Sequence, residues 1–237
     1  FAPASGRQVW TLIDMFPGRP GMTVIGENGG IVMRDGVEVS SHPVDTPTVR
    51  EVIRLVRDAT SGPDGIDGGL VMCGKQFAYV ERTDEGFVEG VMPYYHRTKR
   101  VEDQNAIIDA IEAGQIDDAI VKLAVYVIGP VEPLAQATLA NFADTHQYAI
   151  SGANWADLQI RGVDKGSAVR DLQRFLGVER AQTAVFGDAG NDLSMMGVAD
   201  LSFAMANASQ DVIEAARFVA PSNNEAGVIQ VLRALLK

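Results

Sequence analysis

The segment TAVFGDAGNDLSMMG, residues Thr183–Gly197, decides the fold of this chain. Its apolar run ends at Gly187 and is typical of a buried strand in a parallel sheet, and the residues after it indicate a loop that opens a helix. Asp188 and Asp192 are therefore expected at the carboxyl end of a strand, where open α/β sheets bind their ligands. Two carboxylates gathered there repel each other unless a cation lies between them, and Mg²⁺ is the usual hard cation. The alternative is a solvated acidic loop in which Asn191 or Asp192 caps the helix.

The regions on either side of this segment share its α/β character. Residues 161–237 alternate between helix and strand, beginning with a helix at Lys165, which predicts a doubly wound parallel sheet. The first 41 residues predict a helix over residues 7–16, the strand MTVIG and a hairpin around Asp35-Gly36. Both ends of the chain therefore favour a Rossmann-like parallel core.

The middle of the chain differs from its ends. A helix is predicted from Thr46, with apolar residues Val49, Val52 and Val56 on one face. Strands here come partly in adjacent pairs, which favours a more antiparallel α+β unit. We therefore predict a discontinuous Rossmann-like core formed by residues 1–41 and 157–237, interrupted by an inserted α+β cap domain over residues 42–156.

The composition limits the function classes. The chain has 237 residues and a formal net charge of −11, and no run rich in lysine and arginine occurs, which argues against nucleic-acid binding. No apolar run is long enough to span a membrane, and no signal peptide is visible. The single cysteine, Cys73, lies in an apolar run, so we expect a buried, inert thiol and a cytoplasmic protein.

Three further polar features are expected at the same end of the core as the aspartates. Ser5-Gly6-Arg7 lies where a strand turns into a helix, so the serine hydroxyl either binds phosphate oxygens or caps the helix. Asn28 with the following glycine ends the next strand, where a simple turn is the alternative. Lys165 opens a helix, where its charge opposes the dipole; it is either functional or a solvated lysine. Domain junctions are frequent ligand sites, and we expect these features to converge at one.

A polar and aromatic cluster lies in the predicted cap. Tyr94, Tyr95, His96 and Arg97 either line the entrance to a site or belong to a surface loop between strands. Trp155 is expected to pack in the core or at a domain junction.

Taken together, the motifs resemble the haloacid dehalogenase superfamily. The motifs, in order, are ASGR (4–7), ENGG (27–30), VDKGSAV (163–169), FGDAGNDLSMM (186–196) and FAMANASQDVIEAARFVAPSNNEAGV (203–228). They are most similar to the Cof-type sugar-phosphatase branch, which carries a large α/β cap between its second and third motifs. The similarity is close in the C-terminal third and good over the first 35 residues, and it holds only in outline in the middle.

The resemblance implies a role for each motif residue. Ser5 matches the second-motif residue that donates a hydrogen bond to the transferring phosphoryl group, with Gly6 and Arg7 beside it. Lys165 matches the third-motif lysine, which neutralises the phosphate and the nucleophile. Asn28 matches an asparagine at the cap junction that faces the site.

The fourth motif is implied to hold Mg²⁺. Asp188 matches the metal ligand, and Asp192 matches the second acid, which supports the metal directly or through water. Asn191 matches the asparagine that orients the phosphate or the lysine.

The first motif of the family does not occur in this sequence. That motif is Asp-x-Asp-Gly-Thr, whose first aspartate forms an aspartyl-phosphate and whose second is the general acid/base. We expect an Asp-x-Asp pair upstream of Phe1; if the gene product begins at Phe1, the enzyme hypothesis fails. The resemblance then implies a Mg²⁺-dependent phosphatase of a small phosphorylated metabolite, such as a sugar phosphate. The alternatives are a phosphomutase and a non-catalytic phosphate-ligand binder that lacks the nucleophile.

Overall fold

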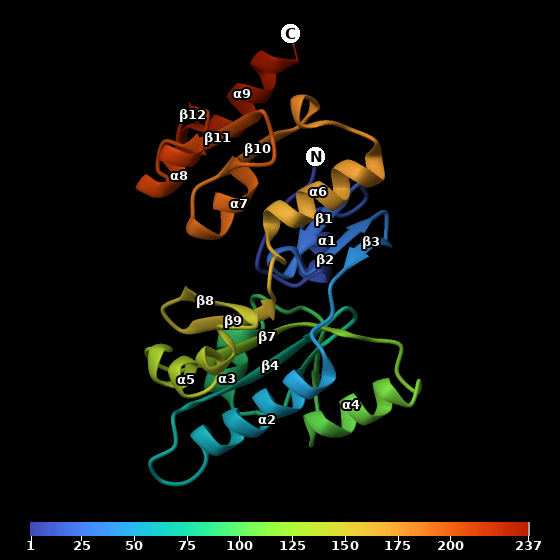
Figure 1. The fold of residues 1–237 in the computed structure, drawn as a ribbon, viewed down its shortest axis with the longest axis vertical. Coiled ribbons are helices and arrows are strands. Elements are labelled where there is room, and N and C mark those ends of the chain that lie inside the picture. The colour runs from blue at the N-terminus through green and yellow to red at the C-terminus, as the bar shows by residue number, and fades with distance from the viewer. Residues whose placement is uncertain (237) are drawn as a thin grey trace. The chain divides into compact units, whose positions relative to one another are not determined.

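The computed structural model describes residues 1–236 and divides into two compact units, Phe1–Val163 and Asp164–Lys237. Figure 1 follows the chain through both units. Each unit combines helices with a sheet, so the α/β class expected from the sequence is confirmed.

The first unit begins with a small antiparallel sheet. Its strands are β1 (Thr23–Gly26), β2 (Ile31–Arg34) and β3 (Val37–Ser41), with β2 between the other two. The predicted hairpin turn is confirmed, since Asp35 and Gly36 have φ values of 50° and 78°. Helix α1 (Val9–Met15) packs Val9 and Leu12 against this sheet. An isolated parallel bridge from Ala4 to Ile25 places the residues before α1 beside β1.

The rest of the first unit is built on a larger sheet. Within the described residues it has six strands in the order β6-β5-β4-β7-β9-β8. Their bounds are β4 (Gly68–Gly74), β5 (Ala78–Val80), β6 (Thr98–Arg100), β7 (Ile120–Val127), β8 (His146–Gly152) and β9 (Trp155–Ile160). Only the β5–β6 pair of this sheet is parallel, so the predicted antiparallel character is confirmed.

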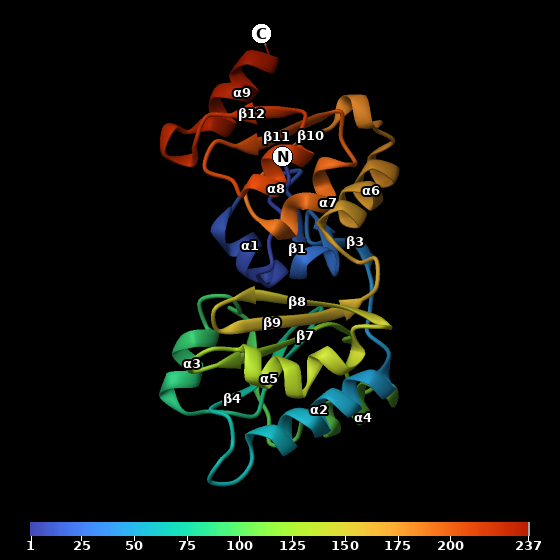
Figure 2. The same ribbon diagram turned by 60° about the vertical axis from the view of Figure 1, so that its left-hand side comes forward.

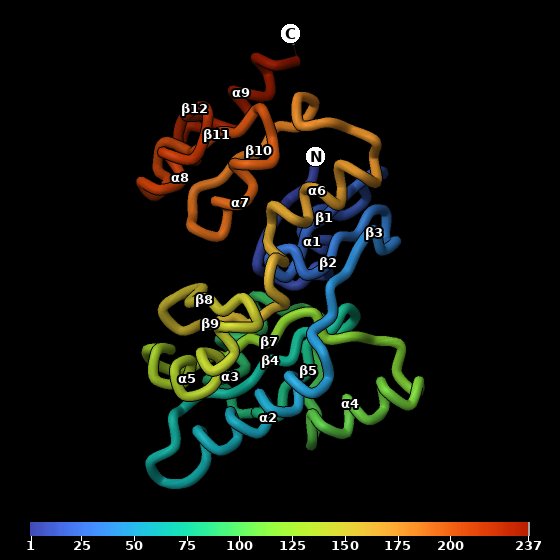
Figure 3. The backbone as a smooth tube through the Cα atoms, viewed as in Figure 1, coloured from blue at the N-terminus to red at the C-terminus, as the bar shows by residue number. Residues whose placement is uncertain are grey.

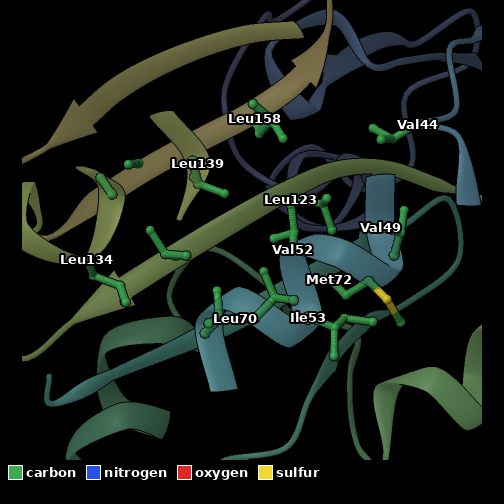
Figure 4. Packing of buried hydrophobic residues seen from close by; sticks show 14 of the residues in the cluster. Val44, Val49, Val52, Ile53, Leu70, Met72, Leu123, Leu134, Leu139 and Leu158 are labelled. Atoms are coloured by element: carbon green, nitrogen blue, oxygen red, sulfur yellow. The ribbon is translucent and has the colours of Figure 1, made fainter. Parts of the chain in front are cut away.

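One face of this sheet is covered by helices and forms the main core. The helices of this region are α2 (Thr46–Thr60), α4 (Gln104–Glu112) and α5 (Glu132–Ala137), followed by the 3₁₀ turn η2 (Leu139–Phe142). The predicted apolar face of α2, with Val49 and Val52, is buried against Leu70, Leu123 and Leu158 of the strands, as Figure 4 shows. Asp45 caps α2 by accepting a hydrogen bond from the Thr48 amide at 2.9 Å.

The other face of the sheet carries a second, smaller core. Helix α3 (Glu85–Val91), which Figure 2 shows beside the sheet, packs Phe87 against Val71, Cys73 and Ala124. Cys73 is fully buried, so the prediction of a buried thiol is confirmed. Burial raises the pKa of this thiol well above its usual range, which keeps the sulfur protonated and unreactive.

The second unit alternates strictly between helix and strand (Figure 3). Its elements are α6 (Lys165–Leu176), η3 (Arg180–Gln182), β10 (Ala184–Gly187), η4 (Gly190–Asp192), α7 (Leu193–Met196), β11 (Leu201–Met205), α8 (Gln210–Ala215), β12 (Phe218–Ala220), η5 (Asn223–Glu225) and α9 (Gly227–Leu235). Both strand pairs, β10–β11 and β11–β12, are parallel, as predicted. Phe186, Phe203 and Phe218 stack across the three strands, with centroid separations of 5.0 and 5.2 Å.

Two expectations about the whole chain have different outcomes. Among residues 1–236, no helix combines the length and apolar character needed to cross a bilayer. The domain boundaries predicted from the sequence, with a cap over residues 42–156, stay a prediction. The predicted boundary between residues 156 and 157 falls within strand β9, which runs from Trp155 to Ile160.

The contact between α6 and α7 in the second unit depends on a glycine. The Gly166 amide donates a hydrogen bond to Ser194 Oγ at 2.9 Å, and a Cβ atom at Gly166 would lie 2.3 Å from the Ser194 carbonyl oxygen. We expect Gly166→Ala to lower the free energy of unfolding by about 1–3 kcal/mol, because backbone must shift to admit the methyl group.

Gly197→Ala is the matched control. A Cβ atom there would have no heavy atom within 4 Å, and its φ of −81° suits any residue. We expect a change of less than about 1 kcal/mol from this substitution. Urea unfolding of both variants measures the difference, and equal effects would contradict the close approach of α6 to α7.

Candidate active site

The residues singled out from the sequence fall into two groups, one in each unit. Ser5, Gly6, Arg7 and Asn28 belong to the first unit, and Lys165, Asp188, Asn191 and Asp192 belong to the second. Within each unit the fold brings these residues together.

The loop before α1 is held in place by backbone hydrogen bonds. The Ser5 amide donates to the Ile25 carbonyl at 3.0 Å, and the Asn28 amide donates to the Ser5 carbonyl at 3.0 Å. The Arg7 amide donates to Ser5 Oγ at 3.2 Å. The alternative in which Ser5 caps the helix is wrong, because Gln8 occupies the N-cap position of α1 and the serine hydroxyl bonds within the loop instead.

Asn28 lies in a turn with an unusual backbone. Glu27, Asn28 and Gly29 form the 3₁₀ turn η1, with φ values of 50°, 51° and 101°. Two consecutive non-glycine residues with positive φ are uncommon and cost conformational energy. The Asn28 side chain donates from Nδ2 to Asp157 Oδ2 at 3.1 Å, so the turn is tied to β9. The interpretation of Asn28 as part of a turn is confirmed, and the turn also directs the Asn28 side chain toward Asp157.

A buried lysine that the sequence analysis missed joins this loop to the six-stranded sheet. Lys122 Nζ on β7 donates to the Gly6 carbonyl at 2.8 Å and lies 2.7 Å from Glu27 Oε2 and 3.9 Å from Asp157 Oδ1. The side chains of Lys122, Glu27 and Asp157 are only 2%, 1% and 9% exposed. The one signal in the sequence is a single lysine inside the apolar run VKLAVYVI.

Burial and charge act against each other in this cluster. Burial lowers the pKa of Lys122, but attraction to Asp157 and Glu27 outweighs it, and the pKa is raised overall. Burial raises the pKa of Glu27 above its usual value, although Lys122 opposes the shift. Among residues 1–236, Glu27 Oε1 has no hydrogen-bond partner. The lysine therefore stays charged and offsets carboxylates that are poorly solvated.

The second group centres on Asp192. Lys165 Nζ donates to Asp192 Oδ1 at 2.6 Å, and both side chains are less than 10% exposed. Asp192 Oδ2 accepts hydrogen bonds from the Asp188 amide at 3.0 Å and the Ala189 amide at 3.3 Å. The alternative of a solvated Lys165 is wrong, because the lysine is buried in an ion pair.

Asp192 reaches this position because of a glycine in β10. A Cβ atom at Gly187 would lie 2.5 Å from the Asp192 Cβ atom, so a larger residue would displace Asp192. The Asp188 carbonyl accepts a hydrogen bond from the Ser209 amide at 3.0 Å, which fixes the loop at a second point. Asp188 and Asn191 are exposed residues at the carboxyl end of β10.

The donor set of this loop fits Mg²⁺. This ion binds one or two carboxylates together with water and substrate phosphate, and the loop offers the exposed carboxylate of Asp188. Among the described residues there is no group of three or more His, Cys, Asp or Glu side chains that would favour a metal held by protein alone. Asp188 would hold the ion, and Asp192 fixes the loop that carries Asp188.

Comparison with known proteins identifies the family. The family described as haloacid dehalogenase-like hydrolase matches residues 1–232. The 5-amino-6-(5-phospho-D-ribitylamino)uracil phosphatase YbjI of Escherichia coli is 30% identical over 242 residues, which cover 100% of this chain and 83% of YbjI. SMU.1108c of Streptococcus mutans has a similar structure, with a TM-score of 0.78 at 24% identity, covering 100% of this chain and 85% of that protein.

A sugar phosphatase of haloacid dehalogenase subclass IIB, BT4131, also has a similar fold, with a TM-score of 0.69 at 18% identity, covering 99% of this chain and 84% of that protein. The chain belongs to the haloacid dehalogenase-like hydrolases, which confirms the resemblance seen in its motifs. Within that family it is a phosphoric monoester hydrolase.

The buried lysine gives a test of how the first unit is held together. We expect Lys122→Met to lower the free energy of unfolding by about 3–5 kcal/mol near neutral pH, because it leaves buried carboxylates uncompensated. The exposed pair Lys75–Glu38 provides the control; Lys75→Met should cost less than about 1 kcal/mol.

The same variant has a predicted pH dependence. Glu27 has a raised pKa in the folded state, so protonation of Glu27 favours folding, and this contribution is lost as the pH rises through the folded value. Loss of Lys122 removes the charge that opposes this shift, so the pKa of Glu27 should rise further in the variant, and the stability deficit of Lys122→Met should shrink as the pH is lowered from neutral in urea unfolding. A deficit that grows on acidification would contradict this account of the cluster.

Proposed function

We propose that this hydrolase is a Mg²⁺-dependent phosphatase that acts on a small phosphorylated metabolite through an aspartyl-phosphate intermediate. The observation that carries the proposal is the buried Lys165–Asp192 ion pair, whose carboxylate also holds the backbone of Asp188. Phosphoryl transfer depends mainly on positioning and charge neutralisation, and a fixed lysine beside a fixed acidic loop supplies both.

Lys165 is assigned to neutralise phosphate. Its ammonium group has three donors, and the contact with Asp192 uses one of them. The remaining donors are assigned to oxygens of the phosphoryl group. Because the lysine is buried, its charge acts in a medium of lower dielectric than water, where each contact is stronger. Mg²⁺ bound at Asp188 would add positive charge against the same phosphoryl oxygens.

In the first unit, Ser5 and Arg7 are proposed to bind phosphate. Ser5 Oγ accepts a hydrogen bond from the Arg7 amide, so the hydroxyl proton remains to donate to a phosphoryl oxygen. The Arg7 guanidinium supplies a positive charge in the same loop as Ser5. Asn28 and Asn191 are proposed to orient the phosphoryl group and its partners, and attack on phosphorus is assigned to the aspartate of the family's first motif.

The range of substrates follows from the relatives. The name of the E. coli phosphatase specifies a phosphate on a ribityl chain that carries a uracil ring. We propose that the substrate of this chain is a phosphate monoester of comparable size, such as a sugar phosphate or a phosphorylated sugar alcohol derivative.

Asp188 provides the test. In the natural full-length protein we expect Asp188→Asn to weaken Mg²⁺ binding in calorimetry and to lower release of phosphate from p-nitrophenyl phosphate by about 10²–10³-fold, because the metal loses its carboxylate. Asp64→Asn makes the same charge change at an exposed residue in a loop of the first unit, and it should leave both Mg²⁺ binding and phosphate release unchanged.

Full activity of the Asp188→Asn variant would refute the assignment. Binding of Mg²⁺ and phosphate by the unaltered protein without any release of phosphate would instead support a non-catalytic binder.

A further inference from the structure

The face of the six-stranded sheet that carries Lys122 continues into a group of aromatic side chains. Tyr126 on β7 is paired with Trp155 on β9, just as Ala124 is paired with Asp157. Side chains two residues apart on a strand point to the same face, about 7 Å from each other. Trp155 therefore lies two residues before Asp157 on the same face of β9, and Asp157 accepts the hydrogen bond from the Asn28 side chain.

The aromatic rings contact one another closely. The Trp155 ring lies 4.8 Å from the Tyr126 ring and 5.4 Å from the Tyr94 ring, measured between centroids. Trp155 is half-buried, whereas Tyr94 is 39% exposed. Core packing accounts for the buried rings of the group, as expected for Trp155. It does not account for Tyr94, whose exposed ring makes a T-shaped contact with the indole.

Tyr94 is joined to the loop proposed to bind phosphate. Its carbonyl accepts hydrogen bonds from the Gln8 amide and from Thr11 Oγ1, both at 3.1 Å, which anchors the tyrosine to the start of α1. The Arg7 guanidinium lies 5.3 Å from the centre of the Tyr94 ring, within the range of a cation–π contact. The aromatic group and the loop Ser5–Arg7 are therefore neighbours within one unit.

We propose that Tyr94 and Trp155 form a subsite for a planar aromatic ring in the alcohol portion of the substrate. A phosphate ester whose phosphoryl group contacts Ser5 and Arg7 would bring its organic portion beside these rings. Planar rings bind aromatic side chains by offset or edge-to-face stacking, which favours a ring-bearing ester over the same ester without the ring. The inference rests on the proposed function and narrows its substrate class from small phosphate monoesters to ring-bearing ones.

The test compares matched pairs of substrates that differ in the ring. Ribose 5-phosphate is paired with uridine 5′-monophosphate, and ribitol 5-phosphate is paired with riboflavin 5′-phosphate. For the natural full-length protein we expect kcat/KM to be about 10-fold higher for the ring-bearing member of at least one pair.

Substitution of the tryptophan should remove that preference. We expect Trp155→Leu, which keeps an apolar side chain, to lower kcat/KM about 10-fold for the ring-bearing ester and to leave the ring-free ester unchanged. Tyr94→Leu should act in the same direction. Phe175→Leu, at an exposed aromatic on α6, is the control and should change neither. Urea unfolding of each variant checks that the fold is retained.

Two outcomes would overturn the inference. One is an absence of ring preference in both pairs. The other is an equal loss on both members of a pair in Trp155→Leu, which would mean that the tryptophan only supports the structure or stacks on the sugar.

Fluorescence separates failure of the subsite from failure of the proposed function. The chain has two tryptophans, so Trp10 remains as a reference in the Trp155→Leu variant. If no ester releases phosphate, the proposed function fails. Quenching by a ring-bearing ester that is lost in Trp155→Leu still supports the subsite, and an absence of quenching overturns it.

Discussion

The structure of the first unit depends on one buried positive charge. Lys122 Nζ meets Gly6, Glu27 and Asp157, which come from three separate stretches of the chain. An ammonium group removed from water is costly unless carboxylates and carbonyls take the place of its hydration. Because those partners are in place, the lysine fixes the loop at Gly6, the strained turn at Glu27 and strand β9 in one arrangement. Removal of Lys122 would leave two buried carboxylates without a compensating positive charge.

The second unit also depends on a buried lysine that is paired with a carboxylate. Asp192 is buried with Lys165, and its second oxygen holds the amides of Asp188 and Ala189. The carboxylate therefore does two tasks at once, since it balances the lysine and shapes the loop that presents Asp188. In a chain with a net charge of −11, both of these lysines are buried beside carboxylates that offset their charge.

Much of the fold followed from local patterns. The run Ala184–Gly187 and its neighbours predicted parallel strands, and the face of α2 with Val49 and Val52 is buried as its spacing required. Such patterns can be read because side chains alternate with the period of the element that carries them. The burial of Lys122 could not be read in this way, because a lysine within an apolar strand gives no sign of which distant carboxylates will neutralise it.

The sequence by itself determined the α/β class, the order of the elements and the identity of the motif residues, including Lys165 and Asp188. Only the tertiary structure decided that Ser5 bonds within its loop instead of capping α1, and that Tyr94 and Trp155 lie in contact. The physical reason is the range of each constraint. Periodicity and turn chemistry act over a few residues, whereas charge balance and ring packing join residues that are far apart in the chain.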